Sequence, residues 1–479
     1  MTGVQGFLEQ EFPDRALLRV VCEAAEDLHV EAFLVGGYVR DLFLGRPCKD
    51  IDFMCVGDGI RWAEEVFRKL GKVGAPAIHK NFGTASFCHG DLWLEFVGAR
   101  KESYRRNSRN PDVAPGSLEE DLARRDFTIN ALAIRLTGDN RGELIDRFGG
   151  LKHLQEKILV TPLDPLKTFD DDPLRILRGI RLAAQLDFHL ADPVVEGMKA
   201  CRERLRIVAP ERIGEEMNKM LLSPDPAKAF KILFQTGILE VIFPEMARLH
   251  GVEYQDGHGH KDNFFHTLDV LTRLRQKTDK LWLLWSAVLH DIAKPRTKKF
   301  EPGHGWTFHG HEDLGARMVP GIFKKLGLPL NEKCQYVQKL VRLHLRPIVL
   351  SKKEITDSAI RRLIFEAGDD LEDLMLLCEA DITSKNEAKV KRYLSNYQLV
   401  RRKISEVEER DHIRNFQPPV SGEEVMQLFN LPPGRTVGIL KNAIKEAILD
   451  GVIPNDREAA LRLLVEEARK LGLTPANAV

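Results

Sequence analysis

The chain has 479 residues, which is too long for one hydrophobic core and predicts three or four domains. Hydrophobic residues make up 43% of it and charged residues 30%, as is usual for globular proteins, and 71 basic residues balance 71 acidic ones. This balance excludes a globally basic nucleic-acid-binding protein, so any basic surface must be local.

The seven cysteines are scattered, odd in number and free of Cys-x-x-Cys pairs, which indicates reduced thiols. The N-terminal residues show no basic segment followed by an apolar one, and no apolar run reaches the length of a membrane span. We therefore expect a cytoplasmic protein that does not enter membranes.

Residues 1–30 predict a leading helix, because apolar side chains recur there at helical spacing. A strand-like run then ends at Gly36-Gly37, where the absence of Cβ atoms lets backbone N–H groups approach a triphosphate. A helix predicted over residues 38–44 would add the positive end of its dipole. Arg40 lies one turn into that helix, where a guanidinium can meet phosphate oxygens.

Asp50 and Asp52 are two residues apart on the next predicted strand, so their side chains point the same way. Two convergent carboxylates suit Mg²⁺, and a pair of such ions can hold the attacking and leaving oxygens in phosphoryl transfer. The pattern from Gly36 to Asp52 therefore predicts metal-dependent chemistry on a nucleotide.

This stretch, LVGGYVRDLFLGRPCKDIDF at residues 34–53, resembles the nucleotidyltransferase superfamily, and within it the bacterial-type (class II) tRNA nucleotidyltransferase and poly(A) polymerase family. The family's RRDFTINAL motif is present in full at residues 124–132. The resemblance implies an α/β head with a small mixed or antiparallel sheet, in which Asp50 and Asp52 are catalytic. It also implies that Arg125 contacts the triphosphate and that the region of Asp126 and Asn130 recognises the ribose.

A third carboxylate on a neighbouring strand is expected in this superfamily. Glu95 fits, because in the alternating run of residues 92–97 it points opposite to Leu94 and Phe96. An ordinary exposed strand glutamate is an equally good interpretation. The polar, arginine-rich residues 99–119 predict a loop over the active site.

From residue 151 onward the chain is expected to be almost wholly helical. Residues 169–188, FDDDPLRILRGIRLAAQLDF, place an acid and three arginines at spacings of three, which predicts one helix face carrying Asp172, Arg175, Arg178 and Arg181. The segment resembles the family motif E-D-P-L-R-x-L-R, with Asp171 in place of Glu. The resemblance implies that Asp172 and Arg175 hydrogen-bond to the base of an incoming C or A, and that Arg178 and Arg181 reach towards phosphate.

Eight of the fifteen histidines fall between residues 258 and 344. The ordered series that they form with two aspartates resembles the HD phosphohydrolase superfamily, whose members bind divalent metals: His266, His290, Asp291, His311, His344 and Asp381. Imidazole and carboxylate groups suit a transition metal such as Ni²⁺, Co²⁺ or Mn²⁺. His311 and His344 would support a second ion.

The sequence thus predicts an α/β head followed by an all-α body. We divide it into a leading helix (1–30), the head (31–150), a helical neck for nucleotide selection and RNA binding (151–250), an HD domain (251–390) and a helical tail that contacts tRNA (391–479). The basic span after residue 385 is either a solvated face or a track for tRNA phosphates.

The resemblance implies a tRNA nucleotidyltransferase that adds CCA to tRNA 3′ ends from CTP and ATP, with Mg²⁺ at the head. The head motifs leave open a poly(A) polymerase, or an enzyme that adds only CC or only A. A third possibility is a chain that acts mainly as an HD phosphohydrolase with an RNA-binding head. The sequence does not indicate the oligomeric state.

Overall fold

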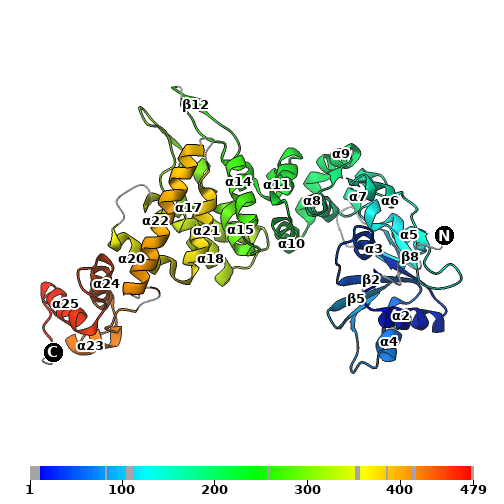
Figure 1. The fold of residues 1–479 in the computed structure, drawn as a ribbon, viewed down its shortest axis with the longest axis horizontal. Helices are drawn as coiled ribbons and strands as arrows, with labels where there is room; N and C mark the ends of the chain where they lie inside the picture. Colours follow the sequence, from blue (N-terminus) through cyan, green and yellow to red (C-terminus); the bar gives the residue numbers. More distant parts are fainter. Residues whose placement is uncertain are drawn as a thin grey trace. The chain divides into compact units, whose positions relative to one another are not determined.

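The structure is a computed structural model of the chain, shown in Figure 1. It describes residues 11–80, 83–103, 112–256, 258–350, 356–383, 387–411, 414 and 417–475. Contacts divide the chain into two compact units, Met1–Ala247 with Leu326–Leu328, and Arg248–Lys325 with Pro329–Val479. The two units are described separately below.

The first unit contains a seven-stranded sheet with the strand order β3-β4-β5-β2-β1-β8-β9. β2 and β5 pair in parallel and the other neighbours are antiparallel, so the sheet is mixed. In this order the strands are Ala77–His79, Thr84–His89, Leu92–Gly98, Asp50–Val56, Glu31–Val35, Ala133–Arg135 and Leu144–Ile145.

One face of the sheet carries an aromatic core. Phe53 of β2 stacks on Phe96 of β5 at a centroid distance of 4.9 Å, and Trp62 of helix α4 (Gly59–Lys69) meets both rings edge-on. The Trp62 indole donates to the carbonyl of Val21 in helix α2 (Arg15–Asp27), which ties both helices to this face. Side chains alternate along a strand, so Asp50 and Asp52 lie on the opposite face. The leading helix is confirmed at Arg15–Asp27.

The predicted loop of residues 99–119 is partly wrong. β6 (Arg100–Ser103) and β7 (Asp112–Pro115) pair as an antiparallel hairpin, and helix α5 (Leu118–Ala123) begins at a capping box made by Ser117 and Glu120. Residues 104–111, which include much of the arginine-rich stretch, lie outside the described residues.

The remaining helices of the first unit follow the strands in chain order. They are α3 (Gly36–Phe43), η2 (Thr128–Asn130), α6 (Gly150–Gln155), α7 (Pro165–Asp171), α8 (Leu174–Leu186), α9 (Asp192–Cys201), η3 (Arg202–Ile207), α10 (Pro210–Leu221), α11 (Pro226–Gln235), α12 (Ile238–Ile242) and α13 (Pro244–Ala247).

The second unit is mostly helical. Its helices are α14 (Asn263–Arg275), α15 (Leu281–Leu289), α16 (Lys294–Thr297), α17 (His311–Lys325), α18 (Glu332–Leu343), α19 (Arg346–Leu350), α20 (Asp357–Ala367), η4 (Gly368–Asp370), α21 (Leu371–Asp381), α22 (Glu387–Asp411), α23 (Gly422–Phe429), α24 (Arg435–Asp450) and α25 (Arg457–Lys470).

Short strand pairs interrupt the part of the chain that was expected to be wholly helical. They are β10 (Ile158–Leu159) with β11 (His189–Leu190), β12 (Tyr254–Gln255) with β13 (His258–Gly259), and β14 (Lys299–Glu301) with β15 (Gly305–Thr307). Runs of two or three residues are too short for a visible alternation of apolar and polar positions. The predicted class, a mixed α/β head followed by a mostly helical body, is otherwise confirmed.

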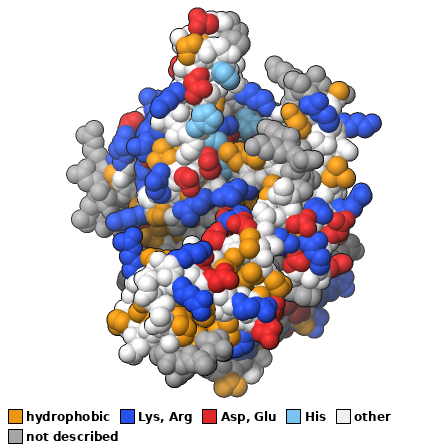
Figure 2. Space-filling view, turned by 90° about the vertical axis from the view of Figure 1, so that its left-hand side faces the viewer, with side chains coloured by type: hydrophobic (Ala, Val, Ile, Leu, Met, Phe, Trp, Pro, Cys, Tyr) orange, Lys and Arg blue, Asp and Glu red, His pale blue; other side chains and the backbone are white. Residues whose placement is uncertain are grey.

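Basic and acidic side chains lie side by side on the face nearest to the C-terminal helices, as Figure 2 shows. This mixture agrees with the equal numbers of the two kinds in the sequence. All seven cysteines lie within the described residues and are free. None of the helices in the described ranges combines the length and the apolar character needed to cross a membrane.

Candidate functional site

Three carboxylates meet on neighbouring strands of the sheet. In the parallel pairing of β2 with β5, Asp52 lies directly opposite Glu95, and Asp50 precedes Asp52 by two residues on the same face. Leu94 and Phe96, on either side of Glu95, are fully buried on the other face. The register therefore brings Glu95 to the same face as the two aspartates, as expected for a third acid of the site.

Gly36 makes room for this group. It has a φ of +74°, a left-handed conformation that L side chains rarely adopt, and it directly follows β1. A Cβ at this position would lie 2.8 Å from Oδ2 of Asp52 and 3.0 Å from Nη1 of Arg125. The turn thus allows the start of α3 to pass close to the carboxylates, a requirement that sequence reasoning had missed.

The environment of Asp52 disfavours its charge. Burial raises the pKa of this carboxyl to about 6; Arg125 opposes the shift, and Glu95 and Asp50 add to it. Three acids gathered around one buried carboxylate repel one another when ionised. A divalent cation with oxygen ligands would relieve this repulsion, so the donor set fits Mg²⁺.

The RRDFTINAL segment forms a polar network inside the first unit. Asp126 accepts from the Asn130 side chain at 2.9 Å and from Nε of Arg178 at 2.8 Å, and Asn130 accepts from Nη1 of Arg40 at 2.8 Å. Although burial acts in the other direction, Arg178 and Asn130 hold the pKa of Asp126 below its usual range. The network joins α3, η2 and α8 into one assembly.

Two of the predicted phosphate ligands are therefore held by the protein. Arg40 pairs with Asp41 at 2.8 Å as well as with Asn130, and Arg178 pairs with Asp126. Arg181 donates to Glu216 at 2.7 Å and to Gln185 at 2.8 Å. Contacts of these arginines with phosphate stay predictions.

Arg125 is anchored by Asp121, which no pattern had singled out. Its Nη2 lies 3.0 Å from Oδ2 of this buried aspartate, whose other oxygen accepts from Nε of Arg124 at 3.0 Å. Burial alone would raise the pKa of Asp121, but Arg125 and Arg124 hold it below its usual range. The remaining nitrogen of Arg125, Nη1, is the one that lies beside Gly36.

The expected single helix face with Asp172, Arg175, Arg178 and Arg181 is wrong in one respect. α7 ends at Asp171 and α8 begins at Leu174, so Asp172 lies between two helices in an extended conformation. Pro173 explains the break, because the residue before a proline is disfavoured in helical conformation. Oδ2 of Asp172 still lies 3.9 Å from Nε of Arg175, which is buried.

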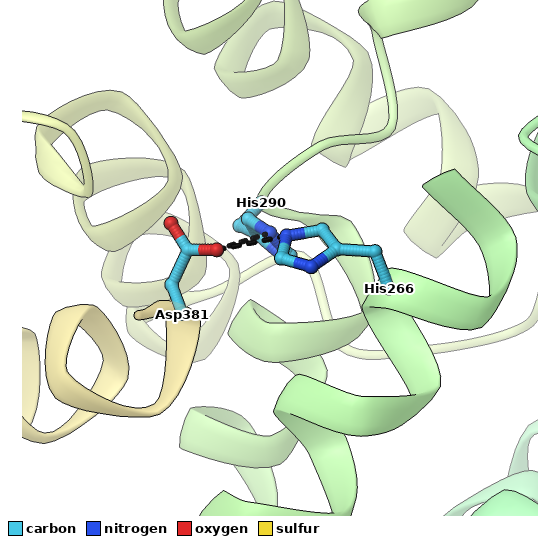
Figure 3. Close-up of side chains that lie close together, drawn as sticks. All are labelled: His266, His290 and Asp381. Atoms are coloured by element: carbon cyan, nitrogen blue, oxygen red, sulfur yellow. Dashed lines mark ion pairs between the residues drawn. The ribbon is translucent and has the colours of Figure 1, made fainter. Parts of the chain in front are cut away.

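A second group of polar side chains converges in the helical unit. His266 comes from α14, His290 and Asp291 follow α15, His311 begins α17, His344 follows α18, and Asp381 ends α21. Two trios have ligand atoms within 4.8 Å of one another, His266 with His290 and Asp381, and Asp291 with His311 and His344. Figure 3 shows the first trio, with both imidazoles directed at the Asp381 carboxylate.

Asp291 links the two trios. Its Oδ2 lies 3.2 Å from Nε2 of His290 and 3.5 Å from Nε2 of His266, and its Oδ1 lies 3.2 Å from Nε2 of His311. Asp381 lies 2.8 Å from Nε2 of His266. Burial would raise the pKa values of both aspartates, but the neighbouring imidazoles hold them well below their usual range.

The other ring nitrogens fix the orientation of these imidazoles. Nδ1 of His290, His311 and His344 lies 2.7, 2.7 and 2.6 Å from the backbone carbonyls of Ala287, Phe308 and Val341, and Nδ1 of His266 lies 2.9 Å from Oγ1 of Thr383. A carbonyl can only accept, so Nδ1 carries the proton in the first three. Their Nε2 atoms are buried without a hydrogen-bond partner. Unpartnered, inward-facing Nε2 atoms fit a divalent metal.

Two contacts of this centre were not anticipated. Lys294 lies three residues after Asp291, and its Nζ is 2.6 Å from Oδ2 of that residue. The i,i+3 spacing was a usable signal for it. Thr383 supports His266 from a segment more than a hundred residues away, for which the sequence carries no signal. His304 and His309, part of the same histidine-rich stretch, are exposed and lie outside both trios.

Three family models match separate parts of the chain. They are described as the Poly A polymerase head domain at residues 32–160, the probable RNA and SrmB-binding site of polymerase A at residues 187–249, and the HD domain at residues 263–385.

Curated relatives match over most of the chain. A CC-adding tRNA nucleotidyltransferase of Thermus thermophilus is 33% identical over 91% of this chain and 93% of its own length. An A-adding tRNA nucleotidyltransferase of Deinococcus radiodurans is 31% identical over 89% of this chain and 94% of its own length. A solved CCA-adding enzyme in an apo form shares the fold with a TM-score of 0.65, at 21% identity over 97% of this chain and 98% of its own.

Proposed function

The chain belongs to the family of tRNA nucleotidyltransferases, and from this premise we propose that it adds CCA to the 3′ ends of tRNA from CTP and ATP. The observation that carries the proposal is the in-register trio of Asp50, Asp52 and Glu95 beside the Gly36 turn. Such a trio serves phosphoryl transfer to a hydroxyl, the reaction that extends an RNA end.

Each residue of the head then has a defined task. Asp50, Asp52 and Glu95 hold divalent ions, for which we propose Mg²⁺; when bound, these neutralise the triphosphate and make the terminal RNA hydroxyl more acidic. Gly36 and Gly37 let the backbone approach the phosphates, and Nη1 of Arg125 points at the same place. Asp126 and Asn130 hold the ribose from the network that also positions Arg40, Arg178 and, on the same helix as Arg178, Arg181.

Base selection is proposed to rest on Asp172 and Arg175. A carboxylate can accept from the exocyclic amine shared by C and A, and a guanidinium can donate to a ring acceptor. The break between α7 and α8 leaves Asp172 outside both helices, and burial keeps the Arg175 side chain in place.

Substitution of either residue should therefore lower selectivity more than triphosphate binding. In Asp172→Ala and Arg175→Ala we expect the preference for CTP and ATP over UTP and GTP to fall by about 1–3 kcal/mol for each lost contact. Single-nucleotide incorporation with each of the four nucleotides measures this. Arg206→Ala, which removes an exposed arginine paired with Glu203, is the control. Unchanged preferences in both variants would place base recognition elsewhere.

Gly36→Ala should impair nucleotide addition even though it adds only one methyl group. The substitution meets both an unfavourable φ and a Cβ 2.8 Å from Asp52, so the carboxylate must shift. We expect incorporation to fall by at least about tenfold, because small displacements of reacting groups have large effects on rate. Gly45→Ala is the control, since Gly45 also has a positive φ but no atom within 4 Å of a Cβ. Equal rates in the two variants would contradict the role of the turn.

One experiment tests the product. Purified protein is given tRNA that lacks its last three nucleotides, with CTP alone, ATP alone, and both. Addition of CC with CTP alone and of CCA with both is expected. Addition that stops after CC even with ATP present, that needs a CC end, or that continues as poly(A) would identify the corresponding alternative product.

The helical centre supports a second function, hydrolysis of phosphoesters such as 2′,3′-cyclic or 2′-phosphate RNA ends. The observation that favours it is the set of three buried, unpartnered Nε2 atoms facing two ionised aspartates. We propose that this centre holds Ni²⁺, Co²⁺ or Mn²⁺, which would supply an activated water when bound. Removal of a damaged end would prepare the RNA for extension by the head.

A further inference from the structure

A cavity of about 780 Å³ opens beside His266 of the helical centre. One wall is a single face of α14 and its N-cap, where Asp262, Phe265, His266, Asp269 and Arg273 lie at spacings of three and four. Tyr254 of β12 lines another part. Its volume is in the range of small-ligand sites, roughly 300–1,000 Å³.

Tyr254 presents an open aromatic face to this cavity. A Cβ on Gly259, its partner in the β12–β13 pair, would lie 2.4 Å from Cε1 and 2.9 Å from Cδ1 and Cζ of the tyrosine. The ring therefore lies flat against the glycine backbone, which leaves 79% of the residue exposed. A large exposed aromatic side chain held in one place is typical of a binding surface.

Phe265 supplies a second aromatic surface in the same cavity. Its ring meets those of Phe264 and His250 edge-on, at centroid distances of 5.3 and 5.7 Å, and the residue is still 42% exposed. Two exposed rings at one cavity suit the flat faces of a nucleobase, which stacks on aromatic side chains in RNA recognition.

Charged groups lie between the rings and the metal-binding trio. Nζ of Lys261 donates to the carbonyl of Thr383 at 2.6 Å, and Nη1 of Arg273 donates to the carbonyl of Ile382 at 2.8 Å, directly after Asp381. A guanidinium has five N–H donors, more than this one contact uses. Both cations thus border the residues that would hold the metal, where the phosphate of a substrate would lie. The exposed Asp269 carboxylate can accept from ribose hydroxyls.

We infer that this cavity binds the terminal nucleoside of an RNA, with its base on Tyr254 and Phe265 and its phosphate at Lys261, Arg273 and the His266 trio. The inference rests on the hydrolase function proposed above and deepens it, since it makes the centre selective for esters of nucleosides over other phosphoesters. Simple phosphate recognition would need the cations but not the two aromatic faces.

The test measures binding and hydrolysis with the full-length protein. The probes are adenosine 2′-monophosphate and glycerol 2-phosphate, which has a similar phosphoester but no base. Titration calorimetry reports affinity and Ni²⁺-loaded protein reports hydrolysis. The variants are Tyr254→Ala, Tyr254→Phe and Gly259→Ala, with Tyr393→Ala as a control tyrosine that does not line the cavity.

In the wild type we expect adenosine 2′-monophosphate to bind at least about tenfold more tightly than glycerol 2-phosphate. Tyr254→Ala and Gly259→Ala should lower the nucleotide affinity about tenfold and raise KM for its hydrolysis, with little effect on glycerol 2-phosphate. Tyr254→Phe and Tyr393→Ala should match the wild type. A binding event at the head, if present, stays in every variant.

The two proposals fail in different ways. Equal affinities of the wild type for both probes, or an unchanged nucleotide affinity and KM in Tyr254→Ala, would overturn the nucleoside site while hydrolysis continues. Base-dependent binding that Tyr254→Ala removes, with no hydrolysis of either ester, would support the site and overturn the hydrolase.

Discussion

Asp52→Ala should abolish nucleotide addition while the protein stays folded. Asp52 lies opposite Glu95, two residues from Asp50 and under the Gly36 turn, so its loss removes the central ligand of the proposed metal site. Loss of several kcal/mol of transition-state stabilisation should reduce single-turnover incorporation by at least about a thousandfold. Asp50→Ala should behave alike, and both variants should still bind tRNA.

The stability of these variants separates chemistry from folding. Because the pKa of Asp52 is raised in the folded protein, ionisation of this group lowers stability as the pH rises from its unfolded value to about 6. Asp52→Asn removes that charge, so in metal-free buffer at neutral pH its unfolding temperature should equal or exceed that of the wild type. Glu64→Ala, on the exposed side of α4, is the control. Wild-type incorporation in Asp52→Ala with Mg²⁺ as the only metal would exclude this site.

His290→Ala and Asp291→Ala should lose bound metal and phosphoester hydrolysis. His290 is fully buried with its Nε2 facing the two aspartates, and Asp291 touches both trios. Removal of either leaves an incomplete set of ligands, so the metal content of purified protein should fall from near stoichiometric to background. Elemental analysis and hydrolysis of 2′,3′-cyclic nucleotides measure the two losses.

The control for this centre is His309→Ala. His309 lies two residues before His311 but is exposed and outside both trios, so metal content and hydrolysis should not change. Asp381→Asn, which keeps the shape of the side chain, guards against loss of the fold and should also lose metal. Wild-type protein that binds none of Ni²⁺, Co²⁺ and Mn²⁺ and hydrolyses no ester would show that the centre is only structural.

Much of the head could be predicted from the sequence because its site is local. Gly36, Asp50 and Asp52 lie within seventeen residues of one another, and the alternation of side chains along β2 and β5 was enough to place Glu95 on the same face. The helical centre was predictable in membership but not in arrangement. The order of its histidines and aspartates carried the resemblance, whereas the division into two trios joined by Asp291 depends on how five helices pack.

The partners of the arginines could not be predicted. Spacing shows which face of a helix a side chain occupies, but not which carboxylate of another element waits there. Arg178 and Arg181 were expected to face phosphate, and they pair with Asp126 from η2 and Glu216 from α10. The break before Pro173 was readable from the chain, yet the regular spacing of charges suggested a continuous helix.

The central claim is that one chain carries two separate centres, a transferase in the head and a hydrolase in the helical unit. The most direct measurement assays tRNA extension and cyclic-phosphate hydrolysis in parallel for the wild type, Asp52→Ala and His290→Ala. We expect Asp52→Ala to lose only extension and His290→Ala to lose only hydrolysis. Loss of both activities in either folded variant, or of neither activity in both, would contradict the account.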